Sequence, residues 1–266
     1  MKEKIKLLII GKNSFIEKNI FFFLKNRIQV NKISFESFKT ISLKNLKKYS
    51  HICNCAISKK YQNKKYSAKN DIDFYISNKI RNLNIIFVFL STRKIYPPKF
   101  NLKENSPTNP RGNYAKNKLI TEKKIKKVLR KNFCILRISN LIGKFRVNSK
   151  SRRVSKTFIY NYQVLKKRKN NYYENHAKDF LSINQFNKIF FKIIFLKLIG
   201  TYNVSLGKKV FISELLKALN KNKDPKNFNK IKIKKNDSFY LNNSKLLKKI
   251  KINILKKQFL KFCQTI

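Results

Sequence analysis

The stretch Leu7-Leu-Ile-Ile-Gly11-Lys-Asn-Ser14-Phe-Ile16 joins an apolar run to a helical pattern through a turn that contains one glycine. Similar short apolar runs, rich in β-branched residues, alternate with longer helical stretches through the first half of the chain. This alternation is typical of a parallel sheet with crossover helices. The predicted strands are residues 6–10, 28–33, 51–56, 85–90 and 133–138, and the predicted helices are residues 15–26, 70–83 and 114–131. Together they predict an α/β fold of the Rossmann type, with a doubly wound parallel sheet.

The alternation loosens after Gly143. Residues 144–153 are polar and basic and predict a loop, and residues 154–167 have a helical pattern. Further on we expect strands at 179–183 and 201–204, helices at 185–198 and at 213–220 with Ser213 as the cap, and a surface turn at 221–229. We therefore expect a Rossmann portion in residues 1–140. Residues 141–266 would be mainly a small C-terminal portion, interleaved with the end of the Rossmann sheet.

The chain is strongly basic. Lys and Arg number 64 against 12 Asp and Glu, a formal net charge of +52, which makes a nucleic-acid-binding protein one alternative function. However, the basic residues are spread from end to end, and lysine outnumbers arginine 54 to 10, unlike a surface built for bidentate contacts to bases or phosphates. Abundant Lys, Asn, Ile, Phe and Tyr are also what an AT-rich genome imposes through its codons. Specific nucleic-acid binding is therefore disfavoured, while nonspecific adhesion to polyanions at low salt is expected.

Cysteine usage and hydropathy indicate the compartment. The four cysteines, Cys53, Cys55, Cys134 and Cys263, contain no C-x-x-C pair, and there are only two histidines, so neither a metal site nor a disulfide framework is expected. The N-terminus enters a strand-like run without a signal-peptide pattern. The most apolar stretch, residues 189–199, is interrupted by two lysines and is too short to span a bilayer. We expect a soluble cytoplasmic protein, with a homodimer as one open alternative for its assembly.

Tyr114 and Lys118 stand four residues apart, a spacing that puts both side chains on one face of a helix. A free tyrosine titrates at roughly pH 10, so a nearby positive charge is needed to favour its phenolate at neutral pH. Thr92, just after an apolar strand, could hold a substrate alcohol or carbonyl while Tyr114 moves its proton. The three residues predict alcohol–carbonyl redox chemistry, but in this lysine-rich chain the spacing alone occurs four times: Tyr61 with Lys65, Tyr75 with Lys79, Tyr114 with Lys118, and Tyr162 with Lys166.

The turn after the first strand has the position of a dinucleotide-binding turn, yet Gly11 is the one glycine that it keeps of three. Ser14 stands at the second position. Glu17 stands at the third, where a carboxylate close to a pyrophosphate is unfavourable. Glu36 is the one acidic candidate for the ribose hydroxyls, about 20 residues beyond the turn, although a solvated surface carboxylate is an equal alternative. The preference between NAD and NADP stays open, with a slight lean to NAD.

The ordered set of segments resembles the extended short-chain dehydrogenase/reductase family, in particular its NAD-dependent epimerase/dehydratase group, which acts on nucleotide sugars. The resemblance spans nearly the whole chain. It rests on residues 7–16, 52–56, 89–97, 103–107, 110–118, 136–143, 179–183 and 200–204. It implies an NAD(P)-dependent enzyme with a nucleotide-sugar substrate, in which residues 1–140 are the NAD(P)-binding portion and residues 141–266 are mainly the substrate-binding portion.

The resemblance also implies roles for individual residues. In that family a Ser or Thr precedes the tyrosine of a V-Y-G run by four positions, and Ile95-Tyr96-Pro97 puts Thr92 at that place. Tyr114 follows 22 residues later, which selects it among the four pairs as the catalytic tyrosine. The implied cofactor-binding residues are Gly11, Ser14, Phe15, Ile16, Glu36, Ala56, Asn70, Lys118 and Ser139, and the implied substrate-binding residues are Thr92 and Asn140. For Ala56 and Asn70 the alternative is a strand end and a helix cap that need no ligand.

Arg93 and Lys94 restrict which of the family's reactions is expected. Sugar-nucleotide dehydratases of the family carry Asp-Glu at these two positions, so dehydration is disfavoured. GDP-fucose synthases carry a cysteine in place of Lys94 and a later histidine, and neither is found. A 4-epimerase or a 4-keto-sugar reductase remains, since both need hydride transfer and one proton-shuttling tyrosine. A degenerate family member that binds a nucleotide or a partner without catalysis is the alternative, motivated by Ser14 and Glu17.

For the two histidines and for a group of basic residues after Gly143, a structural or solvent-exposed role is favoured over a functional one. Neither His51 nor His176 has a recognisable catalytic companion, so a structural or solvent-facing role is expected for both. A basic group could clamp a substrate diphosphate from a closing loop. A solvated loop is nevertheless the favoured interpretation of these residues, which are Lys144, Arg146, Arg152 and Arg153.

Overall fold

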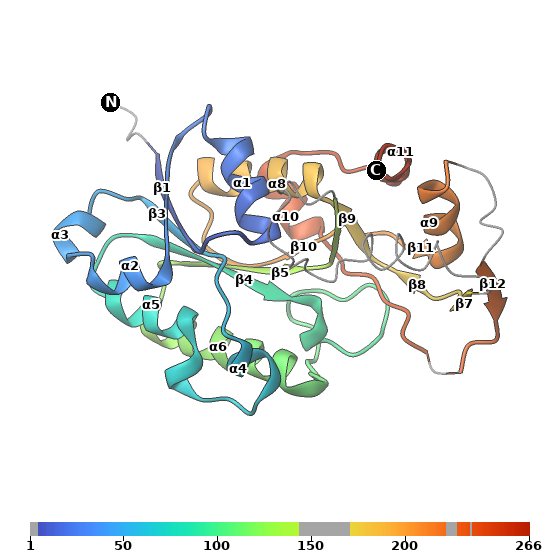
Figure 1. Cartoon of the computed structure of the whole chain (residues 1–266), viewed down its shortest axis with the longest axis horizontal. Helices are drawn as coiled ribbons and strands as arrows, with labels where there is room; N and C mark the ends of the chain where they lie inside the picture. The colour runs from blue at the N-terminus through green and yellow to red at the C-terminus, as the bar shows by residue number, and fades with distance from the viewer. Residues whose placement is uncertain (1–4, 144–170, 222–227, 235) are drawn as a thin grey trace. The chain divides into compact units, whose positions relative to one another are not determined.

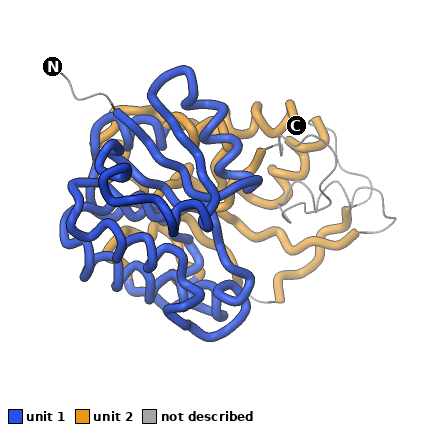
Figure 2. The backbone as a smooth tube through the Cα atoms, turned by 60° about the vertical axis from the view of Figure 1, so that its left-hand side comes forward, with its two compact units in different colours: residues 1–97, 107–138, 189–202 blue, residues 98–106, 139–188, 203–266 orange. Residues whose placement is uncertain are grey.

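The structure is a computed structural model that describes residues 5–143, 171–221, 228–234 and 236–266 (Figure 1). The chain forms two compact units, shown in Figure 2. Unit 1 comprises residues 1–97, 107–138 and 189–202, and unit 2 comprises residues 98–106, 139–188 and 203–266. The predicted loop and helix between residues 144 and 167, with its four basic candidates, lie outside the described residues.

Unit 1 is built on a six-stranded sheet in the order β10-β5-β4-β3-β1-β2. The strands are β1 Lys6–Ile10, β2 Gln29–Ile33, β3 His51–Asn54, β4 Ile86–Thr92, β5 Phe133–Ile138 and β10 Gly200–Val204, the last of which continues into unit 2. All pairings from β2 through β5 are parallel. The strand order reverses between β1 and β3, which confirms the predicted doubly wound fold and marks the edge where such sheets bind ligands.

Helices cover both faces of this sheet: α1 Phe15–Leu24 lies on one face, and α5 Ile72–Ile80 and α6 Gly112–Leu129 lie on the other (Figure 1). Strands buried on both faces need apolar side chains at every position. In β1 all four residues from Leu7 to Ile10 are accordingly buried. On the α5 and α6 side the core contains Ile52, Phe87, Ile76 and Ile125. The edge strand β2 is mostly exposed and mostly polar.

Shorter elements complete unit 1 and correct one prediction. They are α2 Phe35–Thr40, α3 Leu43–Leu46, α4 Lys59–Asn63, and the 3-10 turns η1 Ala68–Asn70 and η2 Arg93–Ile95. The helix predicted at 70–83 is divided into η1 and α5. Asp71, not Asn70, caps α5, since its carboxylate accepts a hydrogen bond from the backbone amide of Phe74 at 3.0 Å.

The described residues of unit 2 form three two-stranded sheets, which pair β6 Asn140–Ile142 with β9 Phe180–Ser182, β7 Asn171–Glu174 with β12 Phe228–Ile231, and β8 Ala177–Lys178 with β11 Val210–Phe211. Its helices are α9 Ile212–Leu219, α10 Ser244–Ile250 and α11 Lys256–Gln264, while α8 Ile183–Phe195 begins in unit 2 and ends in unit 1. Phe180 and Phe259 stack in its core with ring centroids 6.1 Å apart.

Two predictions in unit 2 are wrong at element ends. Ser213 lies inside α9, whose N-cap is Phe211, and the predicted turn at 221–229 runs into β12. Capping by Phe211 has a local cause, because the Glu214 carboxylate accepts a hydrogen bond from the Phe211 amide at 2.8 Å. Within the described ranges, no helix is both long and apolar enough to cross a membrane.

Candidate active site

Thr92 is the last residue of β4 and lies at the carboxyl edge of the sheet. It is buried, with 8% of its surface exposed, and its hydroxyl accepts a hydrogen bond from the Lys94 amide at 3.3 Å. This bond caps the short turn η2 and fixes the Thr92 side chain. A hydroxyl still has a proton to donate when it accepts such a bond, so it remains able to hold a substrate oxygen.

Tyr114 and Lys118 lie in the first half of α6, one helical turn apart. Tyr114 is half-buried, and within the described part of the chain no side chain hydrogen-bonds its hydroxyl. Lys118 is buried, and its Nζ lies 4.3 Å from the ring centroid of Phe89 in β4, the strand that ends in Thr92. In unit 1, Thr92 therefore ends β4 and the Lys118 ammonium lies over Phe89 of the same strand. Tyr114 lies one turn before Lys118 on α6.

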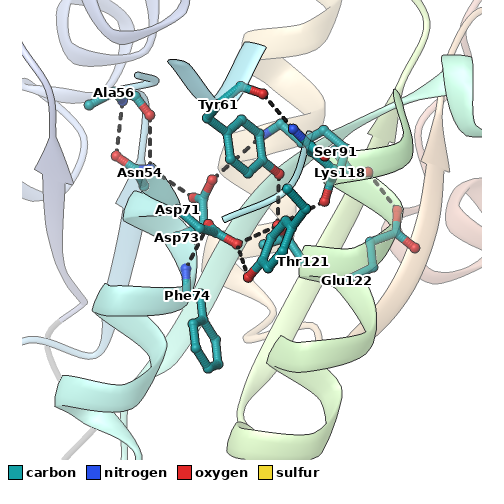
Figure 3. A network of polar contacts seen from close by, with 12 residues as sticks. Asn54, Ala56, Tyr61, Asp71, Asp73, Phe74, Ser91, Lys118, Thr121 and Glu122 are labelled. Carbon is teal, nitrogen blue, oxygen red and sulfur yellow. Dashed lines mark hydrogen bonds and ion pairs between the residues drawn. The ribbon is translucent and has the colours of Figure 1, made fainter. Parts of the chain in front are cut away.

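Lys118 pairs with a carboxylate that the sequence analysis did not identify. Its Nζ lies 3.3 Å from Oδ2 of Asp73 in α5, and both side chains are buried (Figure 3). Burial lowers the pKa of Lys118, but Asp73 and, to a smaller degree, Tyr114 raise it above its ordinary value. For Asp73, burial raises the pKa to about 6, although the positive charge of Lys118 acts to lower it. At neutral pH the ammonium and the carboxylate are thus both ionised.

A second carboxylate, Asp71, closes the network around this pair (Figure 3). Its Oδ2 accepts hydrogen bonds from Thr121 at 2.6 Å and from the Tyr66 hydroxyl at 3.0 Å. The Tyr61 hydroxyl lies 2.7 Å from the Thr121 oxygen, and its ring centroid lies 5.8 Å from the Lys118 Nζ. Burial and the charges of Asp71 and Asp73 raise the pKa of Tyr61 far above its ordinary value. Tyr61 is thereby kept neutral, and the candidate acid/base of the site is Tyr114.

The turn at Gly11 meets the end of β3 at close range. Gly11 has φ +124°, and a Cβ at this position would lie 3.0 Å from the backbone nitrogen of Ala56 and 3.1 Å from the carbonyl carbon of Cys55. Asn54 holds Ala56 from the other side, since its amide exchanges hydrogen bonds with the Ala56 amide and carbonyl at 2.9 and 3.0 Å. A glycine is therefore needed for the turn to approach the end of β3 this closely, and a tight glycine turn after the first strand is also what a dinucleotide-binding turn requires.

Glu17, the side chain expected to oppose a pyrophosphate, is fully buried in α1. Its Oε1 lies 3.3 Å from Nζ of Lys32 in β2. Lys32 thus offsets the carboxylate charge, while the Glu17 Oε2 has no hydrogen-bond partner among the described residues. Ser14 caps the same helix by accepting a hydrogen bond from the Glu17 amide at 3.0 Å. A helix start that is capped by a neutral serine and has its carboxylate paired is compatible with an anion.

The other predicted cofactor residues of unit 1 have these positions. Phe15 is buried and Ile16 half-buried in the first turn of α1. Glu36 lies in the first turn of α2, is largely exposed, and pairs with Lys39 at 2.8 Å. Asn70 ends η1 and is half-buried. Their roles toward a cofactor stay predictions.

Ser139 and Asn140 belong to unit 2. Ser139 is buried, and its hydroxyl has no hydrogen-bond partner among the described residues, which fits a polar ligand. The Asn140 side-chain amide donates to the Asp179 carbonyl at 3.1 Å, so one of its donors is engaged within the unit. Asp179 is itself buried and accepts hydrogen bonds from the backbone amides of Leu206 and Leu241, both at 3.0 Å.

Sequence analysis missed Asp73 and Asn54, the two residues that hold Lys118 and Ala56. One signal was present for Asp73. It lies on the buried face of α5 together with Ile76, Ser77 and Ile80, at positions that a helix otherwise fills with apolar side chains. A charged residue at such a position in a soluble protein needs a buried partner.

The model of the NAD dependent epimerase/dehydratase family matches residues 50–194, more than half of the chain, and the chain therefore belongs to this family. This confirms the resemblance drawn from the sequence. The match includes Thr92, Tyr114 and Lys118, and it begins beyond Gly11 and Glu36. No match was found among proteins of curated function.

Solved structures with the same fold include enzymes of three activities. UDP-N-acetylglucosamine 4-epimerase from Methanobrevibacter ruminantium M1, in complex with UDP-N-acetylmuramic acid, has a TM-score of 0.77 at 19% identity and covers 99% of this chain and 97% of its own. dTDP-glucose 4,6-dehydratase from Bacillus anthracis in complex with NAD has a TM-score of 0.75 at 15% identity, with coverages of 98% and 94%. dTDP-4-dehydrorhamnose reductase from the same organism, in complex with NADP, has a TM-score of 0.72 at 16% identity, with coverages of 92% and 92%.

Proposed function

We propose that this protein is an NAD(P)-dependent enzyme that exchanges a hydride with a nucleotide sugar, as a 4-epimerase or a 4-keto-sugar reductase. One observation carries the proposal: Lys118 is buried and charged one turn after the half-buried Tyr114, and its ammonium lies over the strand that ends in Thr92. Tyr114 and Lys118 lie on the same face of α6, where a cation beside the phenol would serve proton transfer to and from a substrate oxygen. The nucleotide-sugar solved structures and the family match support the substrate class.

Each residue has a defined task in this proposal. Thr92 donates a hydrogen bond to the reacting sugar oxygen and fixes its position. Tyr114 takes the proton from a hydroxyl, or gives one to a ketone, and Lys118 stabilises the phenolate that results. When bound, the nicotinamide ring would supply hydride chemistry. Gly11, Ala56 and the start of α1 would hold the dinucleotide, and Glu36 supports the slight lean to NAD.

The test is Tyr114→Phe, with Tyr75→Phe as the matched control. Tyr75 also precedes a lysine by four residues on a helix, but it is 41% exposed and its ring packs edge-on against Phe35 of α2. Tyr114→Phe should lower turnover by about 10²- to 10⁴-fold, the usual contribution of a general acid/base, with little change in cofactor affinity. Tyr75→Phe should retain full turnover. Unchanged turnover in Tyr114→Phe contradicts the assignment.

A family member that binds another nucleotide or a partner without catalysis is the second candidate, favoured by the carboxylate of Glu17 at the start of α1. Calorimetric titration with NAD, NADH, NADP and NADPH separates the two. Binding by none of the four supports the non-catalytic candidate, and binding followed by an absorbance change at the nicotinamide band with a nucleotide sugar supports the enzyme.

A further inference from the structure

A series of hydrogen bonds connects Lys118 to Ala56 (Figure 3), and the Ala56 backbone in turn lies against the turn at Gly11. Asp73 accepts from the Lys118 ammonium through Oδ2 at 3.3 Å and from the Asn54 amide through Oδ1 at 2.7 Å. Asn54 in turn binds both backbone groups of Ala56, and Gly11 packs directly against the Ala56 backbone. The series joins the turn after β1, the end of β3, α5 and α6.

Burial makes this series rigid. The side chains of Asp73 and Lys118 are 5% and 6% exposed, so neither has water as an alternative partner. The Asn54 amide is also buried and donates to Asp73 while its carbonyl is used by Ala56, which fixes which way the amide points. A buried, fully hydrogen-bonded set of this kind holds one geometry.

We propose that Asp73 is a positioning residue that, through Asn54, fixes the Lys118 ammonium relative to the nucleotide-binding edge at Gly11 and Ala56. The inference rests on the proposed function, because it assigns to Asp73 the task of placing Lys118 for both Tyr114 and the dinucleotide. Asp73 itself touches neither Tyr114 nor the reacting atoms.

The charges around the pair give the inference a measurable signature. Besides Lys118, Asp73 faces Asp71 on its own helix, Tyr61 from α4 and Cys53 from β3, while Tyr114 faces Lys118 from α6. Burial lowers the pKa of Lys118 and Asp73 is the largest influence that raises it. Loss of the Asp73 charge should therefore lower the pH at which Lys118 gives up its proton.

The experiment compares Asp73→Asn with Glu122→Gln. The first keeps the shape of the side chain and its contact with Asn54 but removes the charge. Glu122→Gln removes an equally buried carboxylate, one that is paired with Arg137 at 2.7 Å and is not part of the series. Three quantities are measured from pH 5 to pH 10: kcat/KM, the dissociation constant of the cofactor, and acetic anhydride labelling of Lys118 without ligand, followed by mass spectrometry.

In Asp73→Asn, the alkaline limb of the kcat/KM profile and the onset of Lys118 labelling should both move to lower pH. The cofactor should bind about tenfold or more weakly, as expected for a displaced binding group. Glu122→Gln should lower stability and leave both pH profiles in place. Rescue by Asp73→Glu, which restores the charge, adds support.

Two results overturn the inference. One is a wild-type pH profile and labelling in Asp73→Asn, and the other is tighter cofactor binding or faster turnover in that variant. The second result would mean that Asp73 withholds Lys118 from the site. Failure of the proposed function is distinguishable, because the wild type would then bind no cofactor while the labelling shift of Lys118 is still measured.

Discussion

Gly11→Ala is the substitution that tests the turn between β1 and α1 most directly. Gly11 has φ +124°, and the added Cβ would lie 3.0 Å from a backbone nitrogen that cannot rotate away. Gly200 is a matched control, because it has φ +106° and nothing within 4 Å of an added Cβ. Both substitutions strain the backbone, and only the first creates a clash.

The expected magnitudes follow from these two contributions. A side chain in a sparsely populated backbone region costs on the order of 1–3 kcal/mol, so Gly200→Ala should lower the free energy of unfolding by that amount. Overpacking adds about 1–3 kcal/mol, so Gly11→Ala should lose roughly 2–6 kcal/mol. Because the clash displaces the turn from Ala56, cofactor binding should also weaken at least tenfold, or about 1.4 kcal/mol.

Urea unfolding and calorimetric titration with NAD and NADP measure the two effects separately. Equal losses of unfolding free energy in the two variants would refute the close approach of Gly11 to Ala56. A larger loss of unfolding free energy in Gly11→Ala together with unchanged cofactor affinity would support the contact between Gly11 and Ala56. It would refute the role of the turn in cofactor binding.

Three further substitutions give independent tests. Burial, followed by the charge of Lys197, lowers the pKa of His51 to about 4. The contribution of His51 to the free energy of unfolding should therefore fall by about 3 kcal/mol as the pH falls from 6.5 to 4, at 1.36 kcal/mol per unit. The raised pKa values of the buried Asp73 and Asp179 act in the opposite direction over this range, so the quantity to measure in urea titrations is the difference between the wild type and His51→Gln. This difference should change by about 3 kcal/mol, and His176→Gln should leave the contribution of His51 in place. Glu122→Ala removes the carboxylate that pairs with the buried Arg137 guanidinium and should lower the free energy of unfolding by about 3–5 kcal/mol, whereas a loss of less than about 1 kcal/mol would contradict the buried pairing. Glu36→Gln should reduce the preference for NAD over NADP in calorimetric titrations, and an unchanged ratio of dissociation constants assigns Glu36 to the surface.

The strands were predictable from sequence for a physical reason. β1, β3, β4 and β5 are almost entirely buried, so most of their residues are apolar and form short apolar runs in the sequence. Element ends were less predictable, because neighbouring polar residues compete as caps. Asn70 and Asp71 are both good capping residues, and only the Phe74 amide that Asp71 reaches decides between them.

The candidate site was predictable only in part. Thr92, Tyr114 and Lys118 have a recognisable order and spacing along the chain. In the structure Thr92 ends β4, and Tyr114 and Lys118 lie on α6. Asp73 is 45 residues from its partner Lys118, and no local pattern specifies a contact made by packing α5 against α6. Glu17 was expected to oppose a bound phosphate, but its pairing with Lys32 depends on how α1 packs on β2, which the sequence does not reveal.

Lys32 opposes the pairing of the edge strand β2 with a strand from another molecule. β2 is an outermost strand, and its unpaired backbone groups could recruit a strand from another molecule. A lysine in such a strand opposes this pairing, since a second strand would have to bury its charge. Lys32 therefore both pairs with Glu17 and opposes strand addition at the edge of the sheet. Its replacement by an apolar residue would favour aggregation and would also leave the buried carboxylate of Glu17 unpaired.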